Sequence, residues 1–375
     1  MKKEVNGRRV DLDILRIIAS FAIILAHGVL IFTSEPRYHV KSTEHYFVAD
    51  IVYELLRVGT VPLFFVLAGW GSAMALRRRS PGRFLADRAA RLLLPLAAGI
   101  LLIGPFIKYM ERLQGRSLGL SGLREMPPLH MPFIEFVLLY WGRLNLMTWS
   151  HLWFLGYLFI ISIVLLPLLR FCAQRAPSHA VPHPILVFLP GVALAALLMI
   201  FGGYWPNLPN LLQDWGSLIF YGGCVALGAM LAAWPGFEAR LRLEAPRLLL
   251  LAGFGFVCLM LGRDAVLGRM GVGLCAWGLI GAGFGYAGRW APKPSPMLTW
   301  LGESTMALYI LHHVPVLAIA MLLLPLAIPA FVKLLLIVAL ASVATLALYA
   351  WGVKPFALPR LLLGMEAPAR PGKRV

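Results

Sequence analysis

Residues 14–32 read ILRIIASFAIILAHGVLIF, and this stretch decides the fold. A helix that crosses the hydrocarbon layer of a bilayer needs ~20 mostly apolar residues, and this run has that length. It is preceded by the basic residues Lys2, Lys3, Arg8 and Arg9. Because basic residues beside a span favour the cytoplasmic side, we predict a membrane-spanning helix that begins at the cytoplasmic face.

The composition of the whole chain agrees with this first run. Of the 375 residues, 60% are hydrophobic and only 14% are charged, and the mean hydropathy is +0.79. Soluble domains carry roughly 25% charged residues, so the composition excludes a water-soluble globular protein. The net charge of +17 does not indicate nucleic-acid binding, because the basic residues stand in short clusters between apolar runs.

Further apolar runs predict about ten spans in a single integral membrane domain over residues 1–375. Basic clusters follow the even-numbered spans, and the segment from Lys354 to Arg374 is also basic, so both termini are predicted to be cytoplasmic. The predicted fold class is therefore an all-α, polytopic transmembrane helical bundle. The predicted spans are roughly 14–32, 51–76, 88–107, 151–171, 185–204, 216–234, 248–261, 266–287, 298–324 and 331–351.

Two segments do not fit this regular alternation. Lys108 to Met131 is the longest polar segment, and alternation places it outside although it carries Arg112, Arg116 and Arg124. Residues 133–147 are apolar but too short to span comfortably. We interpret them as an interfacial or re-entrant helix.

Ionisable residues inside apolar runs are energetically expensive and mark functional sites by default. Arg16 and His27 lie eleven residues apart, close to three turns of an α-helix, so both project from one face of the first span. Asp13 lies three residues before Arg16 and can pair with it. We predict that His27 is a catalytic base, since a neutral imidazole can accept a hydroxyl proton, and that Arg16 and Asp13 organise the site.

The third span begins with two arginines. Arg88 and Arg91 are three residues apart, so their guanidinium groups face the same side at the cytoplasmic boundary. Positive-inside topology alone explains such a pair. The functional interpretation is a clamp for a phosphate-bearing donor, because guanidinium forks suit phosphate oxygens.

Candidate substrate-binding residues lie on two later spans. Glu303 and Tyr309 lie on the ninth span with His312 and His313, and adjacent residues on a helix point ~100° apart, so at most one of these two histidines should face a given cavity. The fourth span opens with His151 and Trp153, which are equally typical of interface anchors. We retain Glu303, Tyr309, His312, His151 and Trp153 as substrate-binding candidates.

Other catalytic patterns are missing from the sequence. It contains no phosphate-binding loop and no His-Glu-x-x-His pair. The loop histidines His39 and His45 are expected to be solvated, and no metal is expected.

Five motifs follow one another along Asp11 to Pro315. They are Asp13-Ile-Leu-Arg16 with His27, Phe64-Phe-Val-Leu-Ala-Gly69, Arg88-Ala-Ala-Arg91 with Pro95, His151-Leu-Trp-Phe-Leu155, and Ser304 to Pro315 with Tyr309 and His312. In this order they resemble the acyltransferase-3 family of membrane proteins. Ile17 and Ala68 stand where that family often has Gly and Ser.

This resemblance implies an O-acyltransferase in a bacterial inner membrane. The donor would be a cytoplasmic acyl-CoA, either acetyl-CoA or succinyl-CoA, and the acceptor a hydroxyl of a cell-envelope glycan. The His151-Leu-Trp-Phe-Leu155 segment is similar to the branch of the glucan biosynthesis protein C type, which transfers succinyl groups. Two alternatives remain, a transporter with an ionisable residue near the membrane midplane and a non-catalytic membrane scaffold.

Overall fold

The structure is a computed structural model, and it describes residues 9–119, 122–202, 209–211, 213–262 and 265–366. The prediction that both termini are cytoplasmic rests partly on residues outside these ranges. They include Lys2, Lys3 and Arg8 at one end and Arg370 to Arg374 at the other. The orientation of the chain in the membrane therefore stays a prediction.

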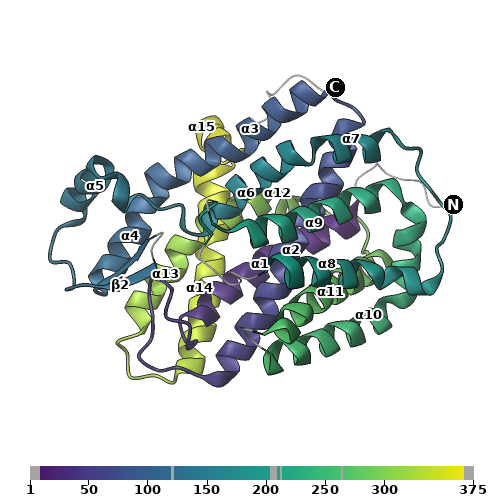
Figure 1. Cartoon of the computed structure of the whole chain (residues 1–375). Helices are drawn as coiled ribbons and strands as arrows, with labels where there is room; N and C mark the ends of the chain where they lie inside the picture. The colour runs from purple at the N-terminus through teal and green to yellow at the C-terminus, as the bar shows by residue number, and fades with distance from the viewer. Residues whose placement is uncertain (1–8, 120–121, 203–208, 212, 263–264, 367–375) are drawn as a thin grey trace. The chain divides into compact units, whose positions relative to one another are not determined.

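The described residues form an all-α bundle with one small hairpin, so the predicted fold class is confirmed (Figure 1). The hairpin pairs β1 (Arg116–Gly119) with β2 (Gly122–Glu125) in antiparallel register. The α-helices are α1 (Val10–Leu30), α2 (Phe47–Leu76), α3 (Pro81–Ala98), α4 (Gly104–Leu113), α5 (Phe133–Gly142), α6 (Trp153–Val164), α7 (Leu166–Gln174), α8 (Leu189–Phe201), α9 (Trp215–Ala233), α10 (Pro235–Leu261), α11 (Val266–Trp290), α12 (Pro296–Leu311), α13 (His313–Leu323), α14 (Ala330–Ala347) and α15 (Ala357–Leu362). Short π-helical turns lie at η1 (Gly99–Ile103) and η5 (Leu348–Val353), and 3₁₀ turns at η2 (Leu144–Leu146), η3 (Ser150–Leu152) and η4 (Pro184–Val187).

The described residues of each of the ten predicted spans lie mainly on apolar helix. Among the described residues, eight helical stretches are long and apolar enough to cross a membrane alone. The other two predicted spans are bent helix pairs, η3–α6 with α7 at 67° and α12 with α13 at 61°. Proline explains both breaks, since Pro167 and Pro315 each lack the N–H that would continue the helical ladder.

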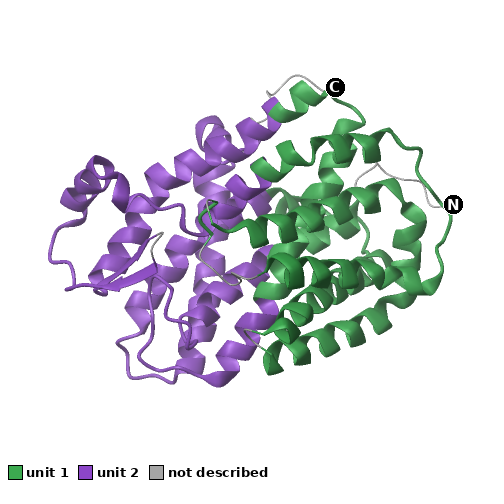
Figure 2. Ribbon diagram, in the orientation of Figure 1, with its two compact units in different colours: residues 1–19, 57–85, 160–303 green, residues 20–56, 86–159, 304–375 purple. Residues whose placement is uncertain are grey.

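The chain divides into two compact units, coloured in Figure 2. Unit 1 comprises residues 1–19, 57–85 and 160–303, and unit 2 comprises residues 20–56, 86–159 and 304–375. Several helices, among them α1 and α12, contribute residues to both units.

Unit 1 is built around the close pair of helices α10 and α11. A Cβ at Gly271 would lie 2.4 Å from the backbone nitrogen of Leu259, and one at Gly278 would lie 2.5 Å from that of Ala252. Small residues let two helix backbones approach this closely, as is common in membrane bundles. Helix α10 begins at Pro235, so Arg240 and Arg247, which lie between the predicted spans 216–234 and 248–261, are on this helix.

In unit 2, the start of the segment from Lys108 to Met131 is helical, which the sequence did not predict. Helix α4 continues to Leu113, so Lys108 and Glu111 are helical and buried, and the side of the membrane on which the segment lies stays a prediction. Arg116 on β1 donates to the backbone carbonyl oxygens of Pro36 and Tyr38. Lys108 and Arg116 are basic residues that the positive-inside rule did not explain in this segment, and their contacts within unit 2 account for them.

Candidate functional site

A cluster of histidines lies in unit 2. His27 is on α1, His39 is in the loop after α1, His151 is in η3, and His312 and His313 stand at the break between α12 and α13. We call these five residues the histidine cluster. All except His27, which is half-buried, are at most 6% exposed.

The five rings are close enough to interact directly. The His313 ring centroid lies 4.6 Å from that of His27, 4.6 Å from that of His151 and 5.2 Å from that of His39. The His27 and His312 centroids are 5.0 Å apart. The His312 ring stacks on that of His313 with 5.9 Å between the centroids, so His313 is in ring contact with all four other members of the cluster.

Backbone carbonyls fix the protonation of two rings. His27 Nδ1 lies 2.9 Å from the Ile23 carbonyl oxygen, and His312 Nδ1 lies 2.9 Å from that of Leu308. A carbonyl oxygen only accepts, so each Nδ1 carries the proton and donates it. His312 Nε2, 3.0 Å from His27 Nδ1, is then an acceptor. The neutral His27 ring keeps an unprotonated Nε2, which can act as a base.

The same reasoning orients the two deeper rings. His151 Nε2 donates to the Ile310 carbonyl oxygen at 3.0 Å, which leaves His151 Nδ1 as an acceptor. His313 Nδ1, 2.8 Å from His151 Nδ1, therefore donates. The Tyr309 hydroxyl donates to the His151 carbonyl oxygen at 2.5 Å, so Tyr309 fixes the turn that carries His151.

The bend at His312 corrects one expectation. On a straight helix His312 and His313 could not face one cavity, but the 61° break between α12 and α13 directs both rings into the cluster. The two adjacent residues share a site because the helix is interrupted at the first of them, His312.

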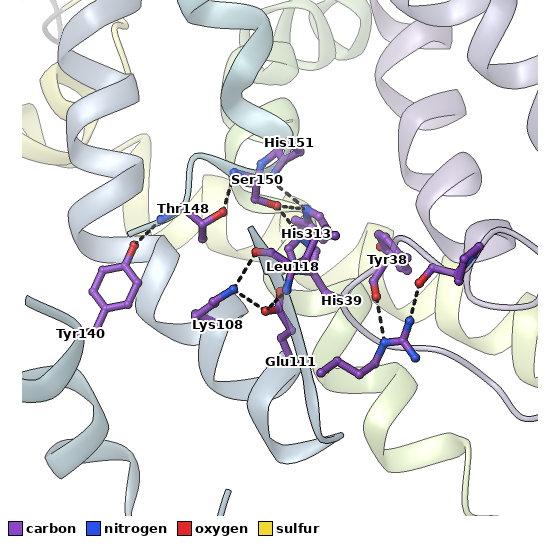
Figure 3. Close-up of polar contacts among 12 residues, drawn as sticks. Tyr38, His39, Lys108, Glu111, Leu118, Tyr140, Thr148, Ser150, His151 and His313 are labelled. Atoms are coloured by element: carbon purple, nitrogen blue, oxygen red, sulfur yellow. Dashed lines mark hydrogen bonds and ion pairs between the residues drawn. The ribbon is translucent and has the colours of Figure 1, made fainter. Parts of the chain in front are cut away.

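His39 is also a correction, because it is not solvated. It is 4% exposed and its Nδ1 hydrogen-bonds a carboxylate oxygen of Glu111, which is fully buried. The other carboxylate oxygen of Glu111 accepts from Lys108 Nζ and from the Leu118 backbone N–H. Figure 3 shows Glu111 between Lys108 and His39. His45, in contrast, is exposed as expected.

Two loop residues frame the end of α1. Tyr38 is 3% exposed and its ring stacks on His27 and His313 at 5.9 and 5.6 Å, and burial raises the pKa of its hydroxyl well above the ordinary value. Lys41 Nζ donates to the carbonyl oxygens of Leu30 and Thr33 at 2.7 and 2.6 Å, and burial lowers the pKa of Lys41 to about 8. A cation at the C-terminal end of a helix is favourable, so Lys41 fixes the end of α1 just beyond His27.

The remaining predicted residues are distributed over both units. Arg16 and Asp13 form the expected ion pair at 3.2 Å within unit 1, and Glu303 is an exposed residue of unit 1. Their functional roles stay predictions.

The predicted donor arginines lie on α3 in unit 2. Arg88 is half-buried, and Arg91 is exposed and pairs with Glu366 at 2.6 Å. Trp153, two residues after His151, is the first residue of α6, and its ring contacts that of Tyr157. Trp153 is thus near the histidine cluster in sequence, while its role in binding stays a prediction.

The sequence did not single out His39, Lys108, Glu111 or Ser150. His39 is separated from Glu111 by 72 residues and from Ser150 by 111 residues, so no local spacing connects them. Only Lys108 and Glu111, an ionisable pair next to an apolar run, could have indicated from the sequence that a buried site lies here.

In the part of the chain that the structure describes, no group of three or more His, Cys, Asp or Glu residues could hold a metal ion.

The comparisons with known proteins give one result. Residues 9–351 match a family model described as an acyltransferase domain, that of the acyltransferase-3 family. The comparisons with curated proteins and with solved structures find no match. Since the family model covers most of the chain and the helices form a multi-pass bundle, this chain belongs to the acyltransferase-3 family and is an integral membrane acyltransferase.

Proposed function

We propose that the protein transfers an acetyl or succinyl group from cytoplasmic acyl-CoA to a hydroxyl of a cell-envelope glycan. His27 is the base that takes the proton of the acceptor hydroxyl as its oxygen attacks the acyl carbonyl carbon. The succinyl-transferring, glucan-modifying branch is the version that the His151-Leu-Trp-Phe-Leu155 segment favours.

The observation that carries this proposal is the hydrogen bonding of His27. Its Nδ1 donates to the Ile23 carbonyl oxygen at 2.9 Å, which fixes the ring and leaves Nε2 without a proton. His27 is the only half-buried member of a cluster whose other rings are buried. A base must be both unprotonated and reachable, and His27 meets both conditions.

The function is tested by following the acyl group itself. The purified protein in liposomes would receive acetyl-CoA or succinyl-CoA labelled in the acyl group, with or without a periplasmic-type glucan. We expect label to appear in the glucan as an ester that mild alkali releases, and CoA thiol to be released in step. Release of thiol without label in any glycan acceptor would contradict the proposed acceptor, and no transfer from either donor would contradict the proposed function.

The donor is proposed to bind through Arg88 and Arg91. Arg88→Ala and Arg91→Ala should each raise the Kd for acyl-CoA by roughly 10-fold or more, because a hydrogen bond to a charged group contributes ~1.5–3 kcal/mol. Arg→Lys keeps the charge but loses the fork, so it should also weaken binding. The measurement is a titration of the reconstituted protein with acyl-CoA.

Arg83→Ala is the matched control for this titration, since Arg83 is an exposed arginine of the same helix. Because Arg91 pairs with Glu366, a phosphate must replace that carboxylate, and Glu366→Gln should tighten binding slightly. If both alanine variants bind acyl-CoA as tightly as Arg83→Ala does, the two arginines serve only the topology of the chain.

A further inference from the structure

Ser150, His39 and Glu111 have the arrangement of a catalytic triad. Ser150 Oγ lies 2.9 Å from His39 Nε2, and the opposite ring nitrogen of His39 bonds the Glu111 carboxylate. All three belong to unit 2, and Figure 3 shows them in one connected series. Such triads occur on unrelated folds and are recognised by geometry, not by sequence position.

The protonation states within this set follow from the donors around Glu111. The carboxylate receives Lys108 Nζ, the Leu118 N–H and His39 Nδ1, all of which are donors. Glu111 is therefore ionised and His39 carries its proton on Nδ1. His39 Nε2 is left to accept the hydroxyl proton of Ser150, which is the relation between base and nucleophile in a triad.

Ser150 is held in a strained conformation. Its φ is +44°, one of two positive values among the described residues other than glycine. Positive φ is costly for a residue with a side chain, and such strain concentrates at functional sites. Its backbone N–H donates to Thr148 Oγ1 at 3.1 Å, and the Thr148 N–H donates to the hydroxyl oxygen of Tyr140 at 3.1 Å. These bonds hold the serine against His39.

Ser150 is the accessible member of the triad. His39 and Glu111 are 4% and 0% exposed, whereas Ser150 is half-buried. A nucleophile must reach its substrate, while its base and orienting carboxylate are best kept away from water.

We propose that Ser150 is a nucleophile that carries the acyl group as a covalent ester, a step that rests on the proposed function. Ser150 Oγ attacks the thioester carbonyl carbon while His39 Nε2 takes the hydroxyl proton. The C–S bond breaks, the sulfur receives that proton from His39, and free CoA thiol leaves. The acyl group is then bonded to Ser150 Oγ.

His27 serves the second half of the reaction. The acceptor hydroxyl attacks the serine ester, its proton passes to His27 Nε2, and the bond between the acyl carbon and Ser150 Oγ breaks. His313 lies between the two centres, with its ring 4.6 Å from His27 and its Nδ1 3.4 Å from Ser150 Oγ. Its Nε2 is buried and has no hydrogen-bond partner among the described residues, so it can receive the proton from His27 while Nδ1 returns one to Ser150.

The test is to trap the ester. The full-length protein in liposomes is incubated with acyl-labelled acetyl-CoA or succinyl-CoA without acceptor, denatured and digested, and the peptide that contains Ser150 is weighed by mass spectrometry. We expect this peptide to gain the mass of the acyl group, and addition of glucan to remove it. Ser150→Ala should lose the label, and Ser150→Cys should carry it on sulfur, as a thioester that hydroxylamine cleaves readily.

Two further variants separate the half-reactions. His39→Gln should prevent acylation of Ser150, whereas His27→Gln should still become acylated but fail to pass the group to glucan. Ser42→Ala is the control, because Ser42 lies in the same loop as His39 but outside the triad.

The outcomes distinguish this proposal from the proposed function. Near-normal acyl transfer by Ser150→Ala, or transfer by the wild type with no acylated Ser150 peptide in any variant, would overturn the covalent route and leave the acyltransferase function intact. Absence of transfer by the wild type from either donor would count against the proposed function instead.

Discussion

His27→Ala is expected to lower kcat/KM for acyl transfer by ~10²–10⁴-fold, the usual effect of removing a positioned base. The reason is that His27 is the half-buried member of the histidine cluster and its Nε2 carries no proton. His27→Gln should be nearly as inactive, because an amide can hydrogen-bond but cannot take a proton near neutral pH. The measurement is the initial rate of label transfer from acyl-CoA to glucan.

His45→Ala is the matched control for this experiment, since His45 is exposed in the loop after α1. Thermal unfolding in detergent should show that the His27 variants are folded. A folded His27→Gln variant with near-normal turnover would show that His27 has a hydrogen-bonding role only, and His312, its partner at 3.0 Å, would become the leading candidate for the base.

Lys108→Met is expected to reduce the free energy of unfolding by ~3–5 kcal/mol, because it removes one partner of a buried ion pair and leaves the other charge. Lys108 is 2% exposed and Glu111 is fully buried. The remaining bonds to His39 and the Leu118 N–H cannot supply the lost positive charge. Equilibrium unfolding in detergent micelles measures the difference from the wild type.

The double variant Lys108→Met/Glu111→Gln separates stability from activity. Removal of both charges should restore much of the stability, since the buried carboxylate is gone. Activity should stay low, because a neutral amide orients His39 less well and does not stabilise its charged form. Arg112→Met is the control, as Arg112 lies next to Glu111 and bonds the sulfur of Met126. Wild-type stability of Lys108→Met would contradict the argument.

The fold could be predicted from the sequence because a bilayer imposes a simple length rule. Each long apolar run had to become a helix, and the described residues form a polytopic bundle with eight such helices, or up to ten if each bent pair is one span. The helix bends, the extension of α4 and the hairpin of β1 and β2 could not be predicted in the same way. They depend on which carbonyls a proline leaves unpaired and on how buried charges neutralise each other.

The site was predicted only in part, for a related reason. His27, His151, Tyr309 and His312 stood out because ionisable or polar groups in apolar runs are conspicuous, and the structure brings these four together. His39 has the features of an ordinary loop residue, because nothing in the sequence near it indicates that it pairs with the Glu111 carboxylate, 72 residues away. Pairings of that kind are created by the fold alone.

The break between α12 and α13 has a consequence for how this segment tolerates mutation. An inserted or deleted residue turns everything beyond it by ~100° about a helix axis, whereas a substitution leaves the direction of the neighbouring side chains unchanged. His312 and His313 reach one cluster only because the interruption falls at His312, between the end of α12 at Leu311 and the start of α13 at His313. The apolar positions around the break can therefore exchange one aliphatic side chain for another, but the number of residues between Tyr309 and Pro315 is fixed.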